Sequence, residues 1–171
     1  MMKDLAKATE QSAQDQRAAQ IQPLNLKTVT LIERVHRRLL DVIKDEFDRR
    51  NRDDINAIQA LLLYNIDEQE ITAGELRTRG CYLGSNVSYN LKKLVELGYL
   101  DHQCSKVDRR SVNIKLTSKG REVRNIVAAL YHKHVRTVEQ VADVYSDDFV
   151  TLNKSLHRLE RFWTDQVLYR L

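Results

Sequence analysis

Polar side chains that suit contacts with nucleic-acid bases and phosphates gather in one stretch, residues 85–120, of this 171-residue chain. Its first part, SNVSYNLKKLVELGYL, predicts an amphipathic helix that ends at a glycine. The polar face of this helix carries Asn86, Tyr89, Asn90 and Lys93, at the spacing i, i+3, i+4 and i+7. Asparagine amides can pair bidentately with adenine, and lysine can reach guanine or a phosphate. The same residue types also occur on ordinary solvated helices.

Ser85, Ser88 and Lys92 flank this face and extend the set of expected contacts. The second part of the stretch, DHQCSKVDRRSVNIKLTSKG, alternates apolar and polar residues from Val112 to Leu116, which predicts a half-buried strand. A helix followed by a two-stranded ribbon with a basic tip is typical of a winged helix-turn-helix. Such a unit contacts DNA with both its helix and its loop.

The basic tip of the ribbon offers Lys106, Arg109 and Arg110 as DNA ligands. Arg109 and Arg110 stand beside Asp108, and we expect Arg109 to contact DNA and Arg110 to pair with an acidic residue, which would stiffen the loop. Between residues 77 and 119, nine basic residues stand against three acidic ones, a net charge of +6, whereas the whole chain carries +4. This concentration of positive charge favours a phosphate-binding partner over a protein-docking role.

Composition limits the other classes of protein. With one proline, five glycines and 42% apolar residues, the chain predicts one mostly helical domain with an extension. No run reaches the ~20 apolar residues of a membrane span, and the first residues lack the apolar segment of a secretory signal. Cys81 and Cys104 form neither a disulfide framework nor a zinc motif, so we expect a cytoplasmic protein without a membrane partner.

Helical spacing of apolar residues predicts a long helix over residues 23–51 and a second over 55–66, capped by Asp53 or Asp54. In the second helix we expect Ile58, Leu61, Leu62 and Ile66 to face the core. Ile71 suits a short strand, and Thr72 suits the first position of a capping box for a brief helix. After the ribbon, Thr117 or Ser118 would cap a helix that runs to about residue 144, and a last helix would cover 147–169.

The fold class is therefore mainly α with a small two- to three-stranded antiparallel wing. The long helices before and after the winged unit hold more apolar surface than that unit can cover, so we expect a homodimer; a monomeric helical cap is the alternative. The expected divisions are a flexible N-terminal arm (residues 1–22), a dimerisation helix (23–52), the winged DNA-binding region (53–120) and C-terminal dimerisation helices (121–171).

From Pro23 to Leu171 the chain resembles the MarR family of bacterial transcriptional regulators. The resemblance rests on the order of the elements and on the LGYL, DRRS and LTSKG motifs at residues 97–100, 108–111 and 116–120. The ITAGELRTRG and LGSNVSYNLKKLVELGYL stretches resemble the branch that contains LdtR, a regulator named for an L,D-transpeptidase gene. Ser105 and Val107 depart from the family's wing pattern, so either Lys106 or Arg109 would enter the minor groove.

The resemblance implies a dimer on double-stranded DNA at a pseudo-palindromic operator, modulated by a small aromatic or phenolic effector. The effector would bind between the dimer helices and the winged unit, where core packing is the alternative role for each residue. The expected effector contacts are His36, Leu39, Leu40, Ile43, Phe47, Leu61 and Tyr64.

Three alternatives to this interpretation stay open or are set aside. A winged protein–protein adaptor without DNA readout and a regulator that senses oxidants through Cys81 or Cys104 both remain open. We expect no enzyme, because the chain has no phosphate-binding glycine loop, nucleophile elbow or HExxH motif. The spacing of the five histidines predicts no metal site, and no cofactor is expected. Nothing in the sequence separates a repressor from an activator.

Overall fold

We describe a computed structural model of the chain, which covers residues 2–66, 71–72, 84–104 and 112–169. The chain divides into two compact units, residues 1–62 and 63–171. No helix within these ranges is long and apolar enough to cross a membrane. The predicted capping box that starts at Thr72 extends outside the described residues.

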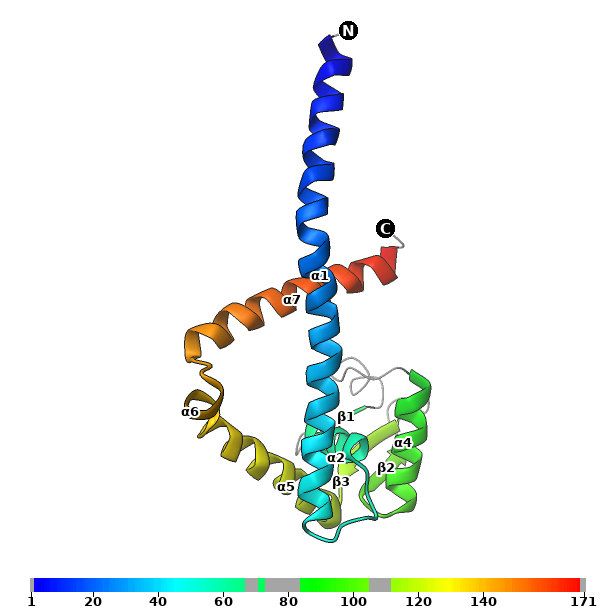
Figure 1. Cartoon of the computed structure of the whole chain (residues 1–171). Coiled ribbons are helices and arrows are strands. Elements are labelled where there is room, and N and C mark those ends of the chain that lie inside the picture. Colours follow the sequence, from blue (N-terminus) through cyan, green and yellow to red (C-terminus); the bar gives the residue numbers. More distant parts are fainter. Residues whose placement is uncertain (1, 67–70, 73–83, 105–111, 170–171) are drawn as a thin grey trace. The chain divides into compact units, whose positions relative to one another are not determined.

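Helix α1 runs without interruption from Met2 to Asp48 in the first unit (Figure 1). The predicted start at Pro23 was wrong, because the proline lies inside the helix. An internal proline removes one backbone donor. The residues before it, rich in alanine and glutamine, are good helix formers, and they continue the helix on the N-terminal side. Whether residues 1–22 form a flexible arm stays a prediction.

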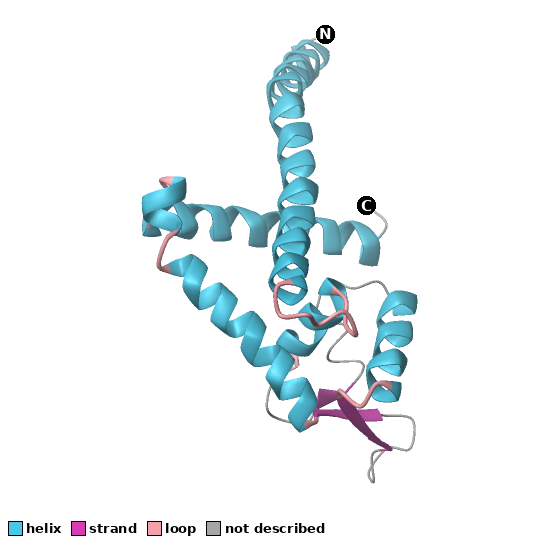
Figure 2. Ribbon diagram, turned by 60° about the horizontal axis from the view of Figure 1, so that its bottom comes forward, coloured by secondary structure: helices cyan, strands magenta, loops and turns pink. Residues whose placement is uncertain are grey.

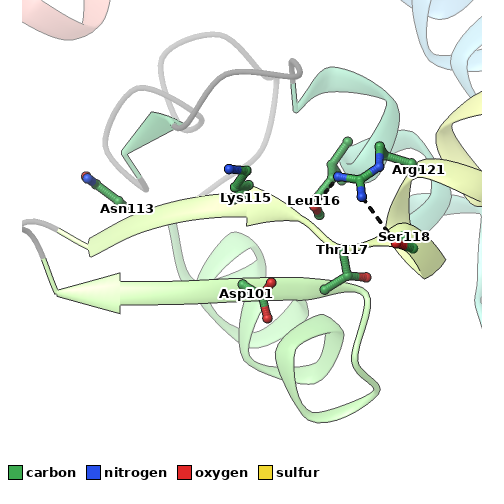
Figure 3. Close-up of a pocket in the computed structure, with 7 residues that line it drawn as sticks. All are labelled: Asp101, Asn113, Lys115, Leu116, Thr117, Ser118 and Arg121. Atoms are coloured by element: carbon green, nitrogen blue, oxygen red, sulfur yellow. Dashed lines mark hydrogen bonds between the residues drawn. The ribbon is translucent and has the colours of Figure 1, made fainter.

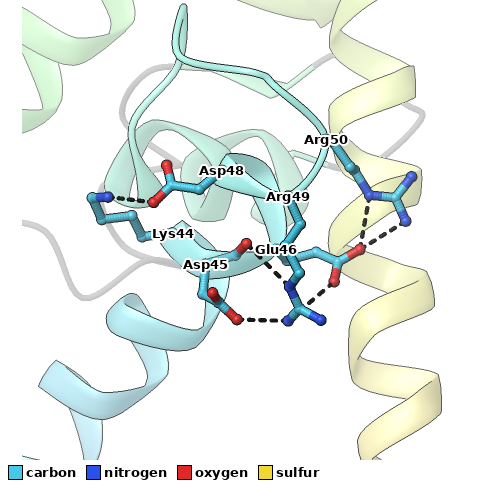
Figure 4. A network of polar contacts seen from close by, with 6 residues as sticks. All are labelled: Lys44, Asp45, Glu46, Asp48, Arg49 and Arg50. Carbon is cyan, nitrogen blue, oxygen red and sulfur yellow. Dashed lines mark hydrogen bonds and ion pairs between the residues drawn. The ribbon is translucent and has the colours of Figure 1, made fainter.

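The end of α1 is set by Asn51, which takes a left-handed conformation (φ 53°). The Arg52 N–H donates to the Phe47 carbonyl and the Asn51 N–H to the Asp48 carbonyl, each at 3.0 Å, which is a Schellman ending. Ion pairs at i, i+3 and i+4 surround the last turns of the helix (Figure 4). A hydrogen bond from Lys44 to Asp48 raises the pKa of that lysine. Exposed pairs of this kind add little stability.

Helix α2 (Ala57–Asn65) begins with a reciprocal capping box, and the predicted cap at Asp53 or Asp54 was wrong. The Gln59 N–H donates to Asn56 Oδ1 at 2.9 Å, and the Asn56 N–H donates to Gln59 Oε1 at 3.2 Å. Leu62, Leu63 and Ile66 are buried, as are Ala60 and Gln59. Ile58, predicted to be in the core, is 40% exposed, so this part of the prediction was wrong.

Three strands of the second unit form an antiparallel sheet in the order β1–β3–β2 (Figure 2). They are β1 (Ile71–Thr72), β2 (Leu100–Cys104) and β3 (Val112–Leu116). Leu100 pairs with Leu116 and His102 with Ile114, and the predicted alternation is confirmed, because Ile114 and Leu116 are buried while Lys115 is exposed. Ile71 pairs with Ile114, so the short strand predicted at Ile71 is the third strand.

Helix α4 (Gly84–Glu96) precedes β2 and buries Leu91 and Leu94. It ends at Gly98, as predicted, because this residue has a positive φ of 75° that only glycine adopts without strain. The Tyr99 N–H donates to the Leu94 carbonyl at 2.8 Å and the Gly98 N–H to the Val95 carbonyl at 3.0 Å. This second Schellman ending turns the chain directly from α4 into the sheet.

A corner joins the end of α4 to the start of helix α5 (Ser118–Val135). Thr117 is its N-cap, one of the two predicted, and the Thr117 side chain accepts from the Gly120 N–H at 3.1 Å. The same hydroxyl group donates toward the Gly98 and Tyr99 carbonyls, at 2.8 and 3.1 Å, and the Thr117 N–H also reaches the Tyr99 carbonyl. A Cβ at Gly120 would overlap the Tyr99 carbonyl oxygen. Only glycine therefore fits at that position.

The helix predicted to run to residue 144 is broken after Val135. The Thr137 hydroxyl bonds back to the His134 carbonyl at 3.2 Å, and the Thr137 N–H donates to the same carbonyl, which competes with continuation of the helix. A short α6 (Val138–Ala142) follows and ends at Asp143 (φ 54°). Helix α7 (Ser146–Tyr169) then begins close to the predicted start and has no buried residue.

We expect Gly120→Ala to destabilise the second unit by about 1–3 kcal/mol, because the added methyl group forces the corner apart. Thermal or urea unfolding followed by circular dichroism measures this. Asn125→Ala, at an exposed position of the same helix, is the control and should change stability by less than about 0.5 kcal/mol. A Gly120→Ala protein as stable as wild type would show that the close approach of Gly120 to Tyr99 is not a constraint.

Candidate nucleic-acid interface

The outer face of α4 is open to solvent between Ser88 and Lys93. Ser88, Tyr89, Lys92 and Lys93 are exposed, and 68% of the Tyr89 surface is accessible. The exposed tyrosine ring and the two lysines lie on one side of the helix, a combination of residue types that suits contact with bases and phosphates. The buried side of the helix, with Leu91 and Leu94, fixes this outward orientation.

For the other predicted DNA contacts, the structure gives less information. Ser85 and Asn86 lie in the first turn of α4, and Asn90 is half-buried at the flank of the exposed face. Lys106, Arg109 and Arg110 lie outside the described residues, between the ends of β2 and β3. The structure thus presents four predicted contacts on one surface, and the remaining assignments stay predictions.

Two of the basic residues counted in this segment form contacts within the protein. Lys93 Nζ lies 3.6 Å from Glu96 Oε2, an exposed pair at the end of α4. Lys119 Nζ donates to the Leu97 carbonyl at 3.2 Å and lies 4.1 Å from the centre of the Tyr99 ring. The sequence count treated both as charge available to DNA. Lys119 is instead part of the corner that holds α4, and only the fold brings it to Leu97.

A polar depression of about 420 Å³ lies on the outer face of the sheet, beside the start of α5 (Figure 3). Asp101 and Lys115 face each other across β2 and β3, so their charges partly cancel. Arg121 donates to the Leu116 carbonyl at 2.9 Å and to Ser118 Oγ at 3.2 Å. These pairings leave this face with mixed charge, and it suits a phosphate backbone less well than the outer face of α4 does.

A second, mainly apolar pocket of about 440 Å³ lies between α4 and the sheet. Its walls are Leu91 and Val95 on the helix and Leu100 and Ile114 on the strands. The polar groups at this pocket are Ser88, Lys92, Glu96 and His102. An apolar cavity with a few polar groups is suited to a small amphipathic molecule. No local sequence pattern indicates this pocket, because its walls come from three separate elements, α4, β2 and β3.

The residues predicted to contact an effector differ in burial. In α1, Ile43 and Phe47 are buried, Leu39 and Leu40 are half-buried, and His36 is exposed. In α2, Leu61 and Tyr64 are half-buried. The Tyr64 ring packs edge-on against Tyr131 of α5, with ring centres 4.9 Å apart. Burial raises the pKa of Tyr131, and its tyrosine neighbour raises it further.

The two cysteines give no support to a redox site or a metal centre. Cys81 lies outside the described residues, and Cys104 ends β2 opposite Val112. In the parts of the chain that the structure covers, no three His, Cys, Asp or Glu side chains are grouped to hold a metal ion. A role for either thiol in sensing oxidants stays a prediction.

The arrangement of α4, the wing strands and the corner defines a winged-helix DNA-binding protein. Residues 55–120 match the family model described as "Winged helix DNA-binding domain". The exopolysaccharide II synthesis transcriptional activator ExpG of Rhizobium meliloti (strain 1021) is 34% identical over 139 residues, which cover 81% of this chain and 71% of ExpG.

Solved structures agree on the fold. AbsC, a MarR family transcriptional regulator from Streptomyces coelicolor, matches with a TM-score of 0.64 at 20% identity, over 83% of this chain and 95% of AbsC. Bordetella bronchiseptica BpsR, whose DNA binding is regulated by 6-hydroxynicotinic acid, matches with a TM-score of 0.62 at 15% identity, over 78% of this chain and 98% of BpsR. Other matched structures, at 16% to 22% identity, are complexes with DNA.

The chain belongs to the family of winged-helix transcriptional regulators that includes ExpG, and its fold matches that of MarR family regulators of known structure. It is a DNA-binding transcriptional regulator, and the fold class predicted from the sequence is confirmed.

We expect Lys92→Ala to weaken binding to every duplex by a similar factor and to reduce the slope of log K against log salt by about 1, because one phosphate contact is lost. Fluorescence anisotropy with a labelled duplex between 50 and 300 mM salt measures both quantities. Lys133→Ala, which removes an exposed charge from α5, is the matched control and should leave the slope unchanged. An unchanged slope for Lys92→Ala would remove Lys92 from the interface.

Proposed function

We propose that the protein is a homodimer that reads a pseudo-palindromic operator through the outer face of α4 and is modulated by a small aromatic effector. The observation that carries the proposal is the exposed row of Tyr89, Lys92 and Lys93 on a helix anchored by a buried opposite face. In this reading Ser85, Asn86, Ser88 and Asn90 complete the helix contacts. The wing adds Lys106, Arg109 and Arg110, with Arg109 toward DNA and Arg110 in an ion pair within the protein.

Uncovered apolar side chains on α1 and α7 support the homodimer. Helix α7 exposes Phe149, Leu152 and Trp163 by 39–50%. Together with Leu156 and Leu159 they follow the 3,4 spacing of a helix–helix seam. In α1, Ile21, Leu24 and Leu31 are 44–66% exposed. Monomeric proteins rarely leave so much apolar surface in water, and a symmetric partner buries equal patches on both subunits. Two α4 helices would then meet half-sites about one turn (~10 bp) apart.

The effector has two candidate locations. One is the predicted crevice with His36, Leu39, Leu40, Ile43, Phe47, Leu61 and Tyr64. The apolar pocket between α4 and the sheet is the other, and its Lys92 and His102 suit a carboxylate or phenolate on an aromatic ring. A ligand there would favour some orientations of α4 over others and so change operator affinity.

Several finer assignments remain proposals. The family match over residues 55–120 supports the predicted DNA-binding region 53–120, and residues 23–52 and 121–171 would provide the dimer contacts. ExpG is a transcriptional activator, and the same DNA contacts would serve activation or repression, depending on where the operator lies relative to the promoter. Placement in the LdtR branch is a further prediction. A protein-docking adaptor is disfavoured by the basic outer face of α4.

Leu152→Glu should convert the dimer to a monomer and lower operator affinity at least tenfold, because it places a charge in the proposed seam. Light scattering after size exclusion reports the oligomeric state. Chromatin precipitation followed by footprinting supplies the operator for anisotropy titrations. Lys154→Glu, an exposed position two residues further along α7, is the control and should remain dimeric. A strictly monomeric wild type, or one that binds no duplex in dilute buffer, would refute the proposal.

Addition of 4-hydroxybenzoate at millimolar concentration should raise the melting temperature of the wild type, because a ligand of the native state stabilises it. Two variants distinguish the candidate locations. Val95→Trp would fill the pocket beside α4, and Leu61→Trp would fill the predicted crevice. The location whose variant abolishes the shift holds the effector. If neither variant changes the shift, both locations are wrong.

A further inference from the structure

The end of α4 is held by a charged side chain that belongs to the next long helix. Leu97 caps α4 at its C-terminus, where the last carbonyls lack partners within the helix and carry partial negative charge. Lys119 Nζ donates to the Leu97 carbonyl at 3.2 Å. The contact joins residues 22 positions apart, so it fixes tertiary structure, not the helix itself.

The same ammonium group lies over an aromatic ring. Lys119 Nζ is 4.1 Å from the centre of the Tyr99 ring, and Tyr99 is fully buried. A cation at this distance is attracted to the face of the ring. Tyr99 is the first residue after Gly98, so Lys119 contacts the chain on both sides of the glycine that ends α4.

The first turn of α5, which carries Lys119, is itself held in place. Thr117 bonds to the Gly98 and Tyr99 carbonyls, and the missing side chain of Gly120 lets α5 approach the Tyr99 carbonyl. The first turn of α5 is therefore anchored to the chain that follows α4. Lys119 adds the contact that reaches back to the helix end, at Leu97.

We propose that Lys119 is a positioning residue that sets the orientation of α4 and so determines operator specificity without touching DNA. The inference rests on the proposed function, in which α4 reads base edges. Base-edge hydrogen bonds depend steeply on geometry, whereas the attraction of lysines to phosphates depends mainly on charge. Loss of Lys119 should therefore impair binding to the operator much more than binding to an unrelated duplex.

The experiment compares wild type, Lys119→Met, Lys119→Gln and Lys119→Arg on the footprinted operator and on a scrambled duplex of equal length, across a salt series. Methionine keeps the apolar stem but removes the charge, and glutamine keeps a hydrogen-bond donor. Arginine keeps both the donor and the attraction to the ring. Lys133→Met controls for the loss of one positive charge on α5, and Lys92→Met provides the behaviour of a phosphate contact.

We expect Lys119→Met to lose about three- to thirtyfold in operator affinity. This range reflects the loss of the contact with the helix C-terminus and of the contact between the cation and the aromatic ring. Its affinity for the scrambled duplex and its salt slope should match those of wild type. Lys119→Arg should recover most of the operator affinity, and Lys119→Gln should fall between the two. Partial unfolding would lower the affinities for the operator and for the scrambled duplex by the same factor. The ratio of these two affinities therefore separates a positioning role from simple destabilisation.

Three results would overturn the proposal in distinguishable ways. Equal weakening on both duplexes with a lower salt slope, as expected for Lys92→Met, would make Lys119 a phosphate contact. An unchanged affinity ratio, with or without a lower melting temperature, would leave Lys119 with a structural role only. If wild type binds the operator and the scrambled duplex alike, the proposed function itself fails; if wild type discriminates between them, only the positioning role is at stake.

Discussion

The carbonyl group of Tyr99 is the point on which the DNA-binding unit depends. It accepts hydrogen bonds from the backbone and the side chain of Thr117, and it occupies the space left by the missing side chain of Gly120. Three elements meet there: the end of α4, the start of β2 and the start of α5. Because a buried carbonyl without a partner costs free energy comparable to a lost hydrogen bond, this junction tolerates few rearrangements.

The junction also divides the winged unit into a fixed part and an accessible part. Leu91 and Leu94 pack inward and the Schellman turn at Gly98 closes the helix, so the outer face of α4 is held in one orientation. A contact surface on a helix that is already folded needs no further backbone ordering when it binds, which lowers the entropic cost of association. Among the described residues, the apolar pocket beside α4 is a place where packing between the helix and the sheet is incomplete.

The sequence predicted those features that depend on local chemistry. Gly98 ends α4, Thr117 caps α5 and the wing strands alternate as expected, because each depends on residues close in the chain. The prediction failed where nearby residues offer competing positions for the start or the end of a helix. Asn56 caps α2 although two aspartates precede it, and Thr137 breaks a helix whose apolar pattern continues. The contact of Lys119 with Leu97 joins residues 22 positions apart, so no local pattern contains it.

The Schellman turn at Gly98 has a mechanical consequence for a protein that reads DNA. Helix α4 has 13 residues and is therefore about 20 Å long, with its support at one end and Ser85 near the other. A tilt of about 5° at the support moves the far tip by nearly 2 Å, about half of the roughly 3.4 Å rise between base pairs. A small change of orientation at Gly98 therefore becomes a larger displacement at Ser85. The turn at the C-terminal end of α4 thus determines how accurately the rest of the helix is placed.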